Sequence, residues 1–505
     1  MKMMKSLLLV SAAGLVAVSG AQAADLPKKA KAVEYVKACS LYGAGFYYVA
    51  GTDICMKIGN YVRWQITANP GSSIGNGPMS GTGGRSTRTD SMDFGQRARA
   101  IATFDTRQQT AYGTLRTYIL MGFTSDSTAA PGATIYATRA FMQIAGFTFG
   151  RASSFFDFAS TAAVAYNAGP MHSSDTGDGG QLVAAYTAQL GSGWSANISA
   201  EQTRRLGTVD LSTNATATTL AYSLVTLTNP AGSNLNGLGV ANVGQFDIVG
   251  SLRLDQAWGS AQVGMAAHDV SASYNSGSEQ GGVAGAGHHP GNKWGTAYMA
   301  GLRLNAPMIG AGDYFQGQLN YSQGATGYLT QAMRANAVNK WSGQTVGYGF
   351  FEDAVYSNTG AGSTGNSIEL TTGFSVFASY EHFWTPALRT SAYGTYIQLT
   401  HNAAATNAIC TSQNFTGSAF QGGTGCSADW SMWGVGSRTQ WNITKDLYVG
   451  LDVLYQKLNS GTSASGFINT PASGAKPAGV AGQQYTVADQ SAVMATWRIH
   501  RDIVP

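Results

Sequence analysis

Polar and apolar residues alternate along most of the chain instead of gathering in blocks. From Met56 onward, segments of about ten residues with a period of two are separated by connections that are either short or long and rich in Gly, Ser and Asn. In the first such segment, Lys57, Tyr61 and Arg63 share one face, and Val62 and Trp64 lie on the other. A period of two predicts β-strands with one polar and one apolar face.

The connections follow a regular order in which every second one is long. Short turns at one end and long loops at the other are typical of an antiparallel barrel in an outer membrane, whereas a soluble all-β protein could place long loops anywhere. We find no repeat that would indicate a solenoid. The pattern predicts an all-β fold, a transmembrane antiparallel β-barrel of about 16 strands. The predicted strands span residues 56–67, 92–106, 112–121, 134–144, 147–155, 181–190, 194–203, 246–254, 260–268, 298–304, 314–321, 368–383, 388–400, 430–441, 447–457 and 490–503.

The composition agrees with this interpretation. Only 11% of the 505 residues are charged, against roughly 25% in an ordinary soluble domain, and 65 are Gly. The mean hydropathy of -0.07 is far from that of a helical membrane protein. After Ala24 no stretch of about 18 uninterrupted apolar residues occurs, so any membrane crossing must be made by strands.

The first residues have the features of a secretory signal. Lys2 and Lys5 precede an apolar run from Leu7 to Val18, and Ala21-Gln22-Ala23 is typical of a cleavage site. The alternative, a membrane-anchoring first helix, is disfavoured because the run is too short to span a bilayer. We predict a signal peptide over 1–23, a periplasmic lead-in over 24–55 and the barrel over 56–505.

Charge and motifs exclude several classes of function. Removing Lys2 and Lys5 lowers the formal charge from +4 to +2, which is too balanced to indicate nucleic-acid binding. The chain has neither G-x-S-x-G nor H-E-x-x-H, and His288-His289 lacks carboxylates at ligand spacing. We therefore expect no enzyme activity, no cofactor and no metal site.

The four cysteines form two local pairs, Cys39 with Cys55 and Cys410 with Cys426. In an exported chain that meets an oxidising periplasm, two local disulfides are expected. Zinc is the rival interpretation, but the spacings are too wide for a zinc knuckle and no His pair completes either site.

Several short stretches closely resemble the alphaproteobacterial porin family. They are Cys-Ser-Leu-Tyr-Gly-Ala-Gly-Phe-Tyr-Tyr from Cys39, Cys-Met-Lys-Ile-Gly-Asn-Tyr-Val-Arg from Cys55, Gly-Thr-Leu-Arg-Thr-Tyr from Gly113, Arg-Ala-Phe-Met-Gln-Ile-Ala-Gly-Phe-Thr-Phe-Gly-Arg from Arg139 and Ser-Phe-Phe-Asp-Phe from Ser154. The resemblance is strong over about 26–190 and near Asp502. It implies a general diffusion porin: a sixteen-stranded homotrimer, in contact with outer-membrane lipid and lipopolysaccharide, whose third extracellular loop folds into each pore. The C-terminus departs from the pattern, because many outer-membrane proteins end in Phe and this chain ends in Pro505.

Arginines recur on the polar faces of the early strands and on the last one. An Arg on the lipid face near the midplane would cost about 2 to 4 kcal/mol, so these side chains are expected to point into the lumen. Either they set ion selectivity, or they fill a wet lumen and pair with carboxylates. The predicted basic wall comprises Arg63, Arg97, Arg99, Arg116, Arg139 and Arg498.

The resemblance also implies acidic residues on the third loop that would face this wall, namely Asp157, Asp175 and Asp178. Asp175 and Asp178 lie among Gly and Ser, where carboxylates commonly form turns, so Asp157 is the stronger candidate.

The sequence thus predicts an outer-membrane pore for ions and small hydrophilic solutes. An outer-membrane enzyme and an adhesive barrel with a plugged lumen share the architecture and stay open as alternatives.

Overall fold

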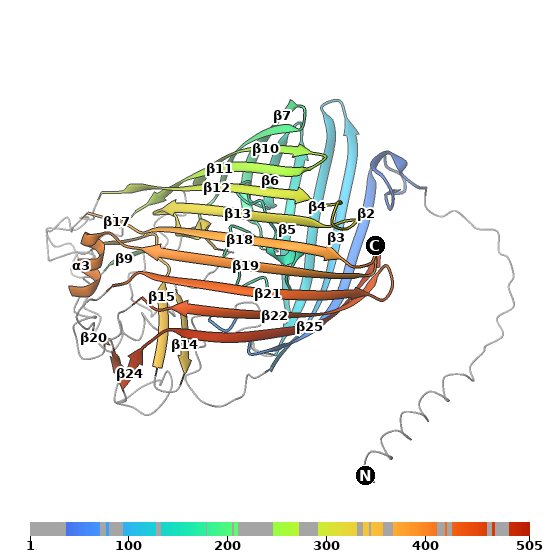
Figure 1. The fold of residues 1–505 in the computed structure, drawn as a ribbon. Coiled ribbons are helices and arrows are strands. Elements are labelled where there is room, and N and C mark those ends of the chain that lie inside the picture. The colour runs from blue at the N-terminus through green and yellow to red at the C-terminus, as the bar shows by residue number, and fades with distance from the viewer. Residues whose placement is uncertain are drawn as a thin grey trace, which may run out of the picture.

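The chain forms a closed antiparallel β-barrel (Figure 1). The structure is a computed structural model that describes residues 37–70, 77–79, 94–127, 133–177, 179–204, 207–210, 246–271, 291–330, 337–342, 345–356, 367–411, 420–421, 427–461, 467–469 and 484–504. The predicted signal peptide and Asp178 lie outside these residues.

Sixteen long strands make up the barrel, as predicted. Each pairs with its neighbours in sequence, and β2 pairs with β25, which closes the sheet. The barrel strands are β2 (Cys55–Ala68), β3 (Phe94–Thr110), β4 (Gly113–Asp126), β5 (Ala133–Ile144), β6 (Phe147–Ala152), β7 (Gln181–Gly191), β8 (Trp194–Gln202), β10 (Phe246–Gln256), β11 (Gly259–Val270), β12 (Lys293–Asn305), β13 (Tyr314–Gln323), β18 (Thr372–Phe383), β19 (Leu388–Thr400), β21 (Trp430–Asn442), β22 (Leu447–Asn459) and β25 (Gln490–Val504).

Most predicted bounds agree within a few residues. β12 begins at Lys293, before the predicted 298, and the differences at β3, β4 and β6 have a local cause. β4 continues to Asp126, which is opposite Arg97 on β3, and β3 continues to Thr110, which is opposite Gly113 on β4. The strands pair over these polar positions although the positions lack apolar alternation. β6 ends at Ala152, earlier than predicted, since the backbone N–H of Phe155 donates to Glu201 (2.9 Å) and turns the chain into the barrel.

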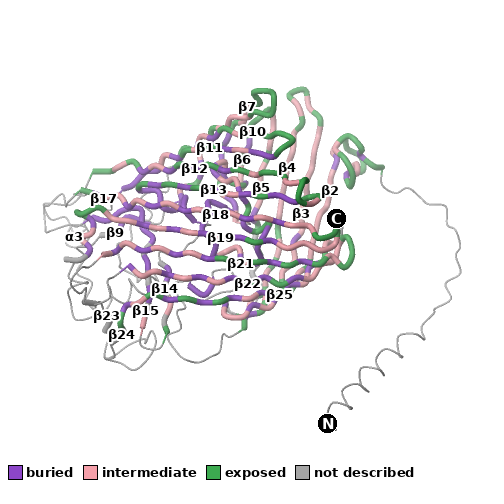
Figure 2. The backbone as a smooth tube through the Cα atoms, in the orientation of Figure 1, coloured by how far each residue is buried: buried purple, intermediate pink, exposed green. Residues whose placement is uncertain are grey.

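The two faces of each strand differ in the sense expected for a barrel in a bilayer. On β13 the polar side chains Gln316, Gln318 and Asn320 are buried, whereas Phe315 and Leu319 are exposed on the outside. On this strand the inward face is therefore polar and the outward face apolar, the reverse of a soluble protein. Figure 2 shows how buried and less buried positions alternate along the barrel strands.

Two-residue to eight-residue turns join strands at one end of the barrel, the turn end, where the C-terminus also lies (Figure 1). Longer segments gather at the opposite end, the loop end. They include β9 (Thr208–Asp210), β14 (Ala337–Ser342), β15 (Thr345–Phe350), β16 (Ala354–Tyr356), β17 (Glu369–Leu370), β20 (Phe420–Gln421), β23 (Phe467–Asn469), β24 (Gln484–Val487), the short helix η5 (Thr326–Tyr328) and helix α3 (Ala403–Thr411). Within the described residues, no helix has the length and apolar character needed to cross a membrane.

A histidine joins two of these loop-end segments. His401 Nε2 lies 2.5 Å from a Glu352 oxygen, and its Nδ1 lies 3.1 Å from an Asp429 oxygen. Burial alone would lower the pKa of His401, but the two carboxylates raise it to about 9. The contact is therefore an ion pair at neutral pH.

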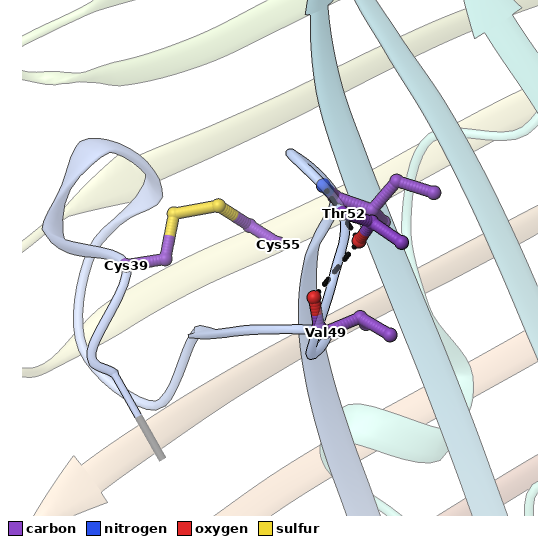
Figure 3. The surroundings of a disulfide bond; sticks show 5 residues. Cys39, Val49, Thr52 and Cys55 are labelled. Carbon is purple, nitrogen blue, oxygen red and sulfur yellow. Dashed lines mark hydrogen bonds between the residues drawn. A yellow bond between two sulfur atoms is a disulfide. The ribbon is translucent and has the colours of Figure 1, made fainter.

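At the turn end, the chain before β2 folds into a small hairpin held by a disulfide. Cys39 and Cys55 are bonded with their Cα atoms 6.0 Å apart, which confirms this pairing (Figure 3). The turn beside it is closed by the hydroxyl of Thr52, which donates to Val49 O at 2.9 Å, and β1 (Tyr47–Tyr48) pairs with the start of β2. Cys426 and the side chain of Cys410 lie outside the described residues.

Candidate functional site

The segment 153–180, between β6 and β7, folds into the barrel and crosses to the far wall. Gln262 on β11 donates to Phe155 O (3.1 Å), and Gln318 on β13 accepts from Ala159 N (2.9 Å). We call this segment the constriction loop. Its course confirms the prediction of a third long loop inside the pore.

The far wall holds the tip of the constriction loop through polar side chains. Asp452 on β22 accepts from the backbone N–H groups of Tyr166 (2.5 Å) and Asn167 (2.8 Å). Arg438 on β21 donates to Ala163 O at 2.8 Å. These hydrogen bonds go to β11, β13, β21 and β22, so this part of the loop lies against that side of the lumen.

Gly450 on β22 permits the close approach of the loop tip. A Cβ at this position would lie 2.3 Å from the hydroxyl of Tyr166. Tyr166 also donates to Gln440 (3.0 Å), and the guanidinium of Arg498 lies over its ring at 4.1 Å.

Asp157 lies on the constriction loop as expected, but its carboxylate is occupied. Arg204 Nη2 donates to it at 2.7 Å, and Thr176 donates from its backbone N–H at 2.7 Å and from its hydroxyl at 2.5 Å. Burial alone would raise the pKa of Asp157, but Arg204 and Thr176 outweigh it and hold the pKa below its usual range. The charge of Asp157 is therefore compensated by Arg204, which follows β8.

Asp175 has the structural role that its Gly/Ser context suggested. It accepts from the backbone N–H and hydroxyl of Thr161 and from the backbone N–H of Gly177. Burial, and after it the nearby charge of Asp157, raise the pKa of Asp175. Neither described carboxylate is left open toward the basic wall.

The predicted wall arginines lie on lumen faces, but several are paired with carboxylates. Arg97 contacts Asp126 at 2.5 Å, and Arg116 contacts Asp105 at 2.9 Å. Asp105 also binds Arg107 at 3.0 Å.

Arg99 and Arg139 have other partners. Arg99 donates to the hydroxyl of Thr124 (2.9 Å). Arg139 donates to Thr138 O (2.8 Å) and to Gly177 O of the constriction loop, so it supports the base of the loop.

Arg63 and Arg498 differ from Arg97 and Arg116 because neither forms an ion pair with a carboxylate in the described part of the chain. Arg498 donates twice to the neutral oxygen of Gln65, at 3.1 and 2.8 Å. The Nε of Arg63 is buried without a hydrogen-bond partner. These two side chains retain uncompensated positive charge on the lumen wall.

Sequence reasoning missed three residues that position the constriction loop: Arg204, Asp452 and Arg438. Strand alternation could have placed Asp452 and Arg438 in the lumen, because both fall on the polar faces of predicted strands. Nothing in the local sequence singles out Arg204, which lies 47 residues from its partner Asp157. No group of three or more His, Cys, Asp or Glu side chains suited to a metal ion occurs among the described residues.

Comparison with known proteins gives a consistent result. A family model described as "Porin subfamily" matches residues 25–493. Porin Omp2a of Brucella abortus (strain S19) is 41% identical over 121 residues, which are 24% of this chain and 34% of that protein. Porin Omp2a of Brucella melitensis biotype 1 is also 41% identical over 121 residues, covering 24% of this chain and 29% of that protein.

The matched stretch thus spans about a third of the length of these curated relatives. Among solved structures, the outer membrane channel DcaP of Acinetobacter baumannii aligns with a TM-score of 0.52 at 12% identity, over 90% of this chain and 99% of that one. This likeness supports the fold.

Proposed function

Because the chain belongs to the porin subfamily, we propose that it is an outer-membrane channel through which ions and small hydrophilic solutes diffuse passively. The observation that carries the proposal is the constriction loop, held against one side of a polar lumen by side chains of the barrel wall. A loop in this position narrows the lumen, and the polar groups around it favour water and hydrated solutes.

Purified protein added to a planar bilayer should produce stepwise increases in conductance. Protein that inserts but never conducts would support the alternative of an adhesive barrel with a plugged lumen. We also propose that the protein catalyses no reaction, so hydrolysis of lipid or peptide that persists through rigorous purification would contradict this part of the proposal.

We further propose that the lumen prefers anions, and that Arg63 and Arg498 provide most of this preference. The support is that Arg97 and Arg116 each bind a carboxylate, whereas Arg63 and Arg498 do not. A charge ring acts on passing ions through its net charge, so an arginine with a bound carboxylate contributes less.

Replacing Arg63 and Arg498 together by Gln should shift the reversal potential under a salt gradient toward cations. Arg501→Gln is the matched control, since it removes the same charge from the outward, exposed side of β25. Equal shifts in the double variant and the control would contradict the assignment.

For the assembly we propose a homotrimer whose outward apolar side chains contact outer-membrane lipid and lipopolysaccharide. Exposed outward residues such as Met121, Phe123 and Met142 support contact with lipid or with another copy. Chemical cross-linking of protein in native membranes should yield a ladder that ends at three copies; a ladder that ends at one copy would contradict the trimer.

A further inference from the structure

We propose that the lumen wall carries a binding site for small organic carboxylates, built by Arg63, His500 and Tyr448 on the neighbouring strands β2, β25 and β22. The inference rests on the proposed function, since it requires solutes to reach the lumen, and it adds a saturable site of defined chemistry to a general charge preference.

The strand register places the three residues in one transverse row. Tyr448 is directly opposite His500, and His500 is directly opposite Arg63. The row continues to Arg99 on β3. It lies one step closer to the turn end than the row of Gly450 and Arg498, against which the tip of the constriction loop packs.

Aromatic rings contact one another in succession along this row and the neighbouring Tyr61. The ring centroids of Tyr448 and His500 are 4.6 Å apart with an interplanar angle of 12°, and those of His500 and Tyr61 are 4.5 Å apart. Tyr166 of the constriction loop extends the stack beyond Tyr448 at 6.2 Å, and the guanidinium of Arg63 lies 5.5 Å from the ring centroid of Tyr61 at its other end.

Tyr448 and Tyr61 flank the ring of His500 at centroid distances of 4.6 and 4.5 Å, so the faces of this ring are covered by its neighbours. The edge of an aromatic ring is its electropositive part. A guanidinium and the edge of a flanked ring in one row form an arrangement that favours an anion.

The charges around the row are unbalanced. Among the described residues of this row and the next one toward the loop end, three guanidinium groups, those of Arg63, Arg97 and Arg498, lie near one carboxylate, Asp126 on β4. The adjoining rows each add one acid. Asp502 contacts His500 Nε2 at 3.1 Å, and Asp452 is occupied by the backbone of the constriction loop.

Two polar atoms in the row are buried and lack a hydrogen-bond partner: Nε of Arg63 and Nδ1 of His500. His500 as a whole is only 8% exposed. Buried polar groups in native proteins are generally satisfied, so these two atoms, one of them in the guanidinium of Arg63 itself, point to a ligand in the row. A carboxylate matches the planar fork of an arginine with two parallel hydrogen bonds, which a spherical halide cannot form.

The test uses benzoate as the probe and compares potassium benzoate with potassium chloride in single-channel recordings of the full-length protein. We expect the conductance of the wild type to saturate at a concentration of benzoate about tenfold lower than for chloride. Arg63→Lys should keep the reversal potential in a chloride gradient but lose this early saturation, because lysine retains the charge without the fork. Arg501→Gln is the control and should behave as the wild type.

Saturation-transfer NMR of benzoate with the detergent-solubilised protein measures binding without requiring conduction. A protein that binds benzoate but forms no channel would contradict the proposed function and leave the site supported. Equal saturation by benzoate and chloride, or benzoate binding unchanged in both Arg63→Lys and Arg63→Gln, would overturn the site.

Discussion

The anchoring of the constriction loop can be tested at one buried ion pair. Arg204 donates to Asp157 and to Ser174, each at 2.7 Å, and its guanidinium lies 4.5 Å from the ring centroid of Tyr328. The side chains of Arg204 and Asp157 are 5% and 12% exposed. Arg204→Met would keep much of the apolar contact with Tyr328 but leave Asp157 charged, buried and without its cation.

Removing one partner of a buried ion pair typically costs about 3 to 5 kcal/mol. If this free energy is lost from the anchored state of the loop alone, the ratio of displaced to anchored loop rises by more than about a hundredfold. Single-channel recordings should then show current fluctuations that the wild type lacks. The double variant Asp157→Asn/Arg204→Met should be quieter than Arg204→Met, because it no longer buries an uncompensated charge.

The current fluctuations of the variant should also depend on pH in a defined direction. In the wild type the pKa of Asp157 lies below its usual range, so its contribution is present above the ordinary value of about 4 and is lost only as the pH falls through the depressed pKa. In Arg204→Met, burial acts without the opposing arginine and should raise this pKa. Acidification should therefore quiet the variant; fluctuations that match the wild type at every pH would refute the reasoning.

Three further predictions concern other parts of the barrel. Gly450→Ala should change the single-channel conductance, because its Cβ would lie 2.3 Å from the hydroxyl of Tyr166, whereas Gly394→Ala, with its nearest atom at 3.6 Å, should not. Cys39→Ser should remove about 3 kcal/mol of loop-closure stabilisation and make the N-terminal hairpin sensitive to protease in limited digestion. The contact between His401 and its two carboxylates should stabilise the loop end fully below the ordinary pKa of about 6.5 and be lost as the pH rises through about 9. The protection of loop-end amides from hydrogen exchange, measured relative to the base-catalysed rate of an unprotected amide at the same pH, should therefore fall in alkali in the wild type but not in His401→Asn.

The barrel itself could be predicted from the sequence because its main constraint is local. A strand between lipid and water must alternate, and a period of two is visible within ten residues or so. The same rule placed Arg97, Arg116 and Arg498 on the lumen face. It did not predict the length of β4, whose end at Ser125 and Asp126 is held by pairing with β3 and not by apolar alternation.

The partners of these charges could not be predicted, because they depend on register and on loop folding. Asp126 is opposite Arg97, whereas the neutral Gln65 is opposite Arg498. A shift of the strand register by one residue would change both partners. Asp157 was correctly placed on the loop, yet its partner Arg204 comes from beyond β8. Such a contact depends on the folded course of the loop, which no local sequence pattern shows.

The ion preference of such a lumen depends on where its net charge lies. An arginine contributes to the field along the pore according to the carboxylates within reach, and the sheet fixes these through pairing. The pairing of β3 with β4 places Asp126 beside Arg97 and Asp105 beside Arg116. At the seam where the last strand meets the first, the side chain that accepts from Arg498 is the neutral Gln65. The barrel closes at this seam, so the strands that complete the fold are also the ones that carry its unpaired positive charge.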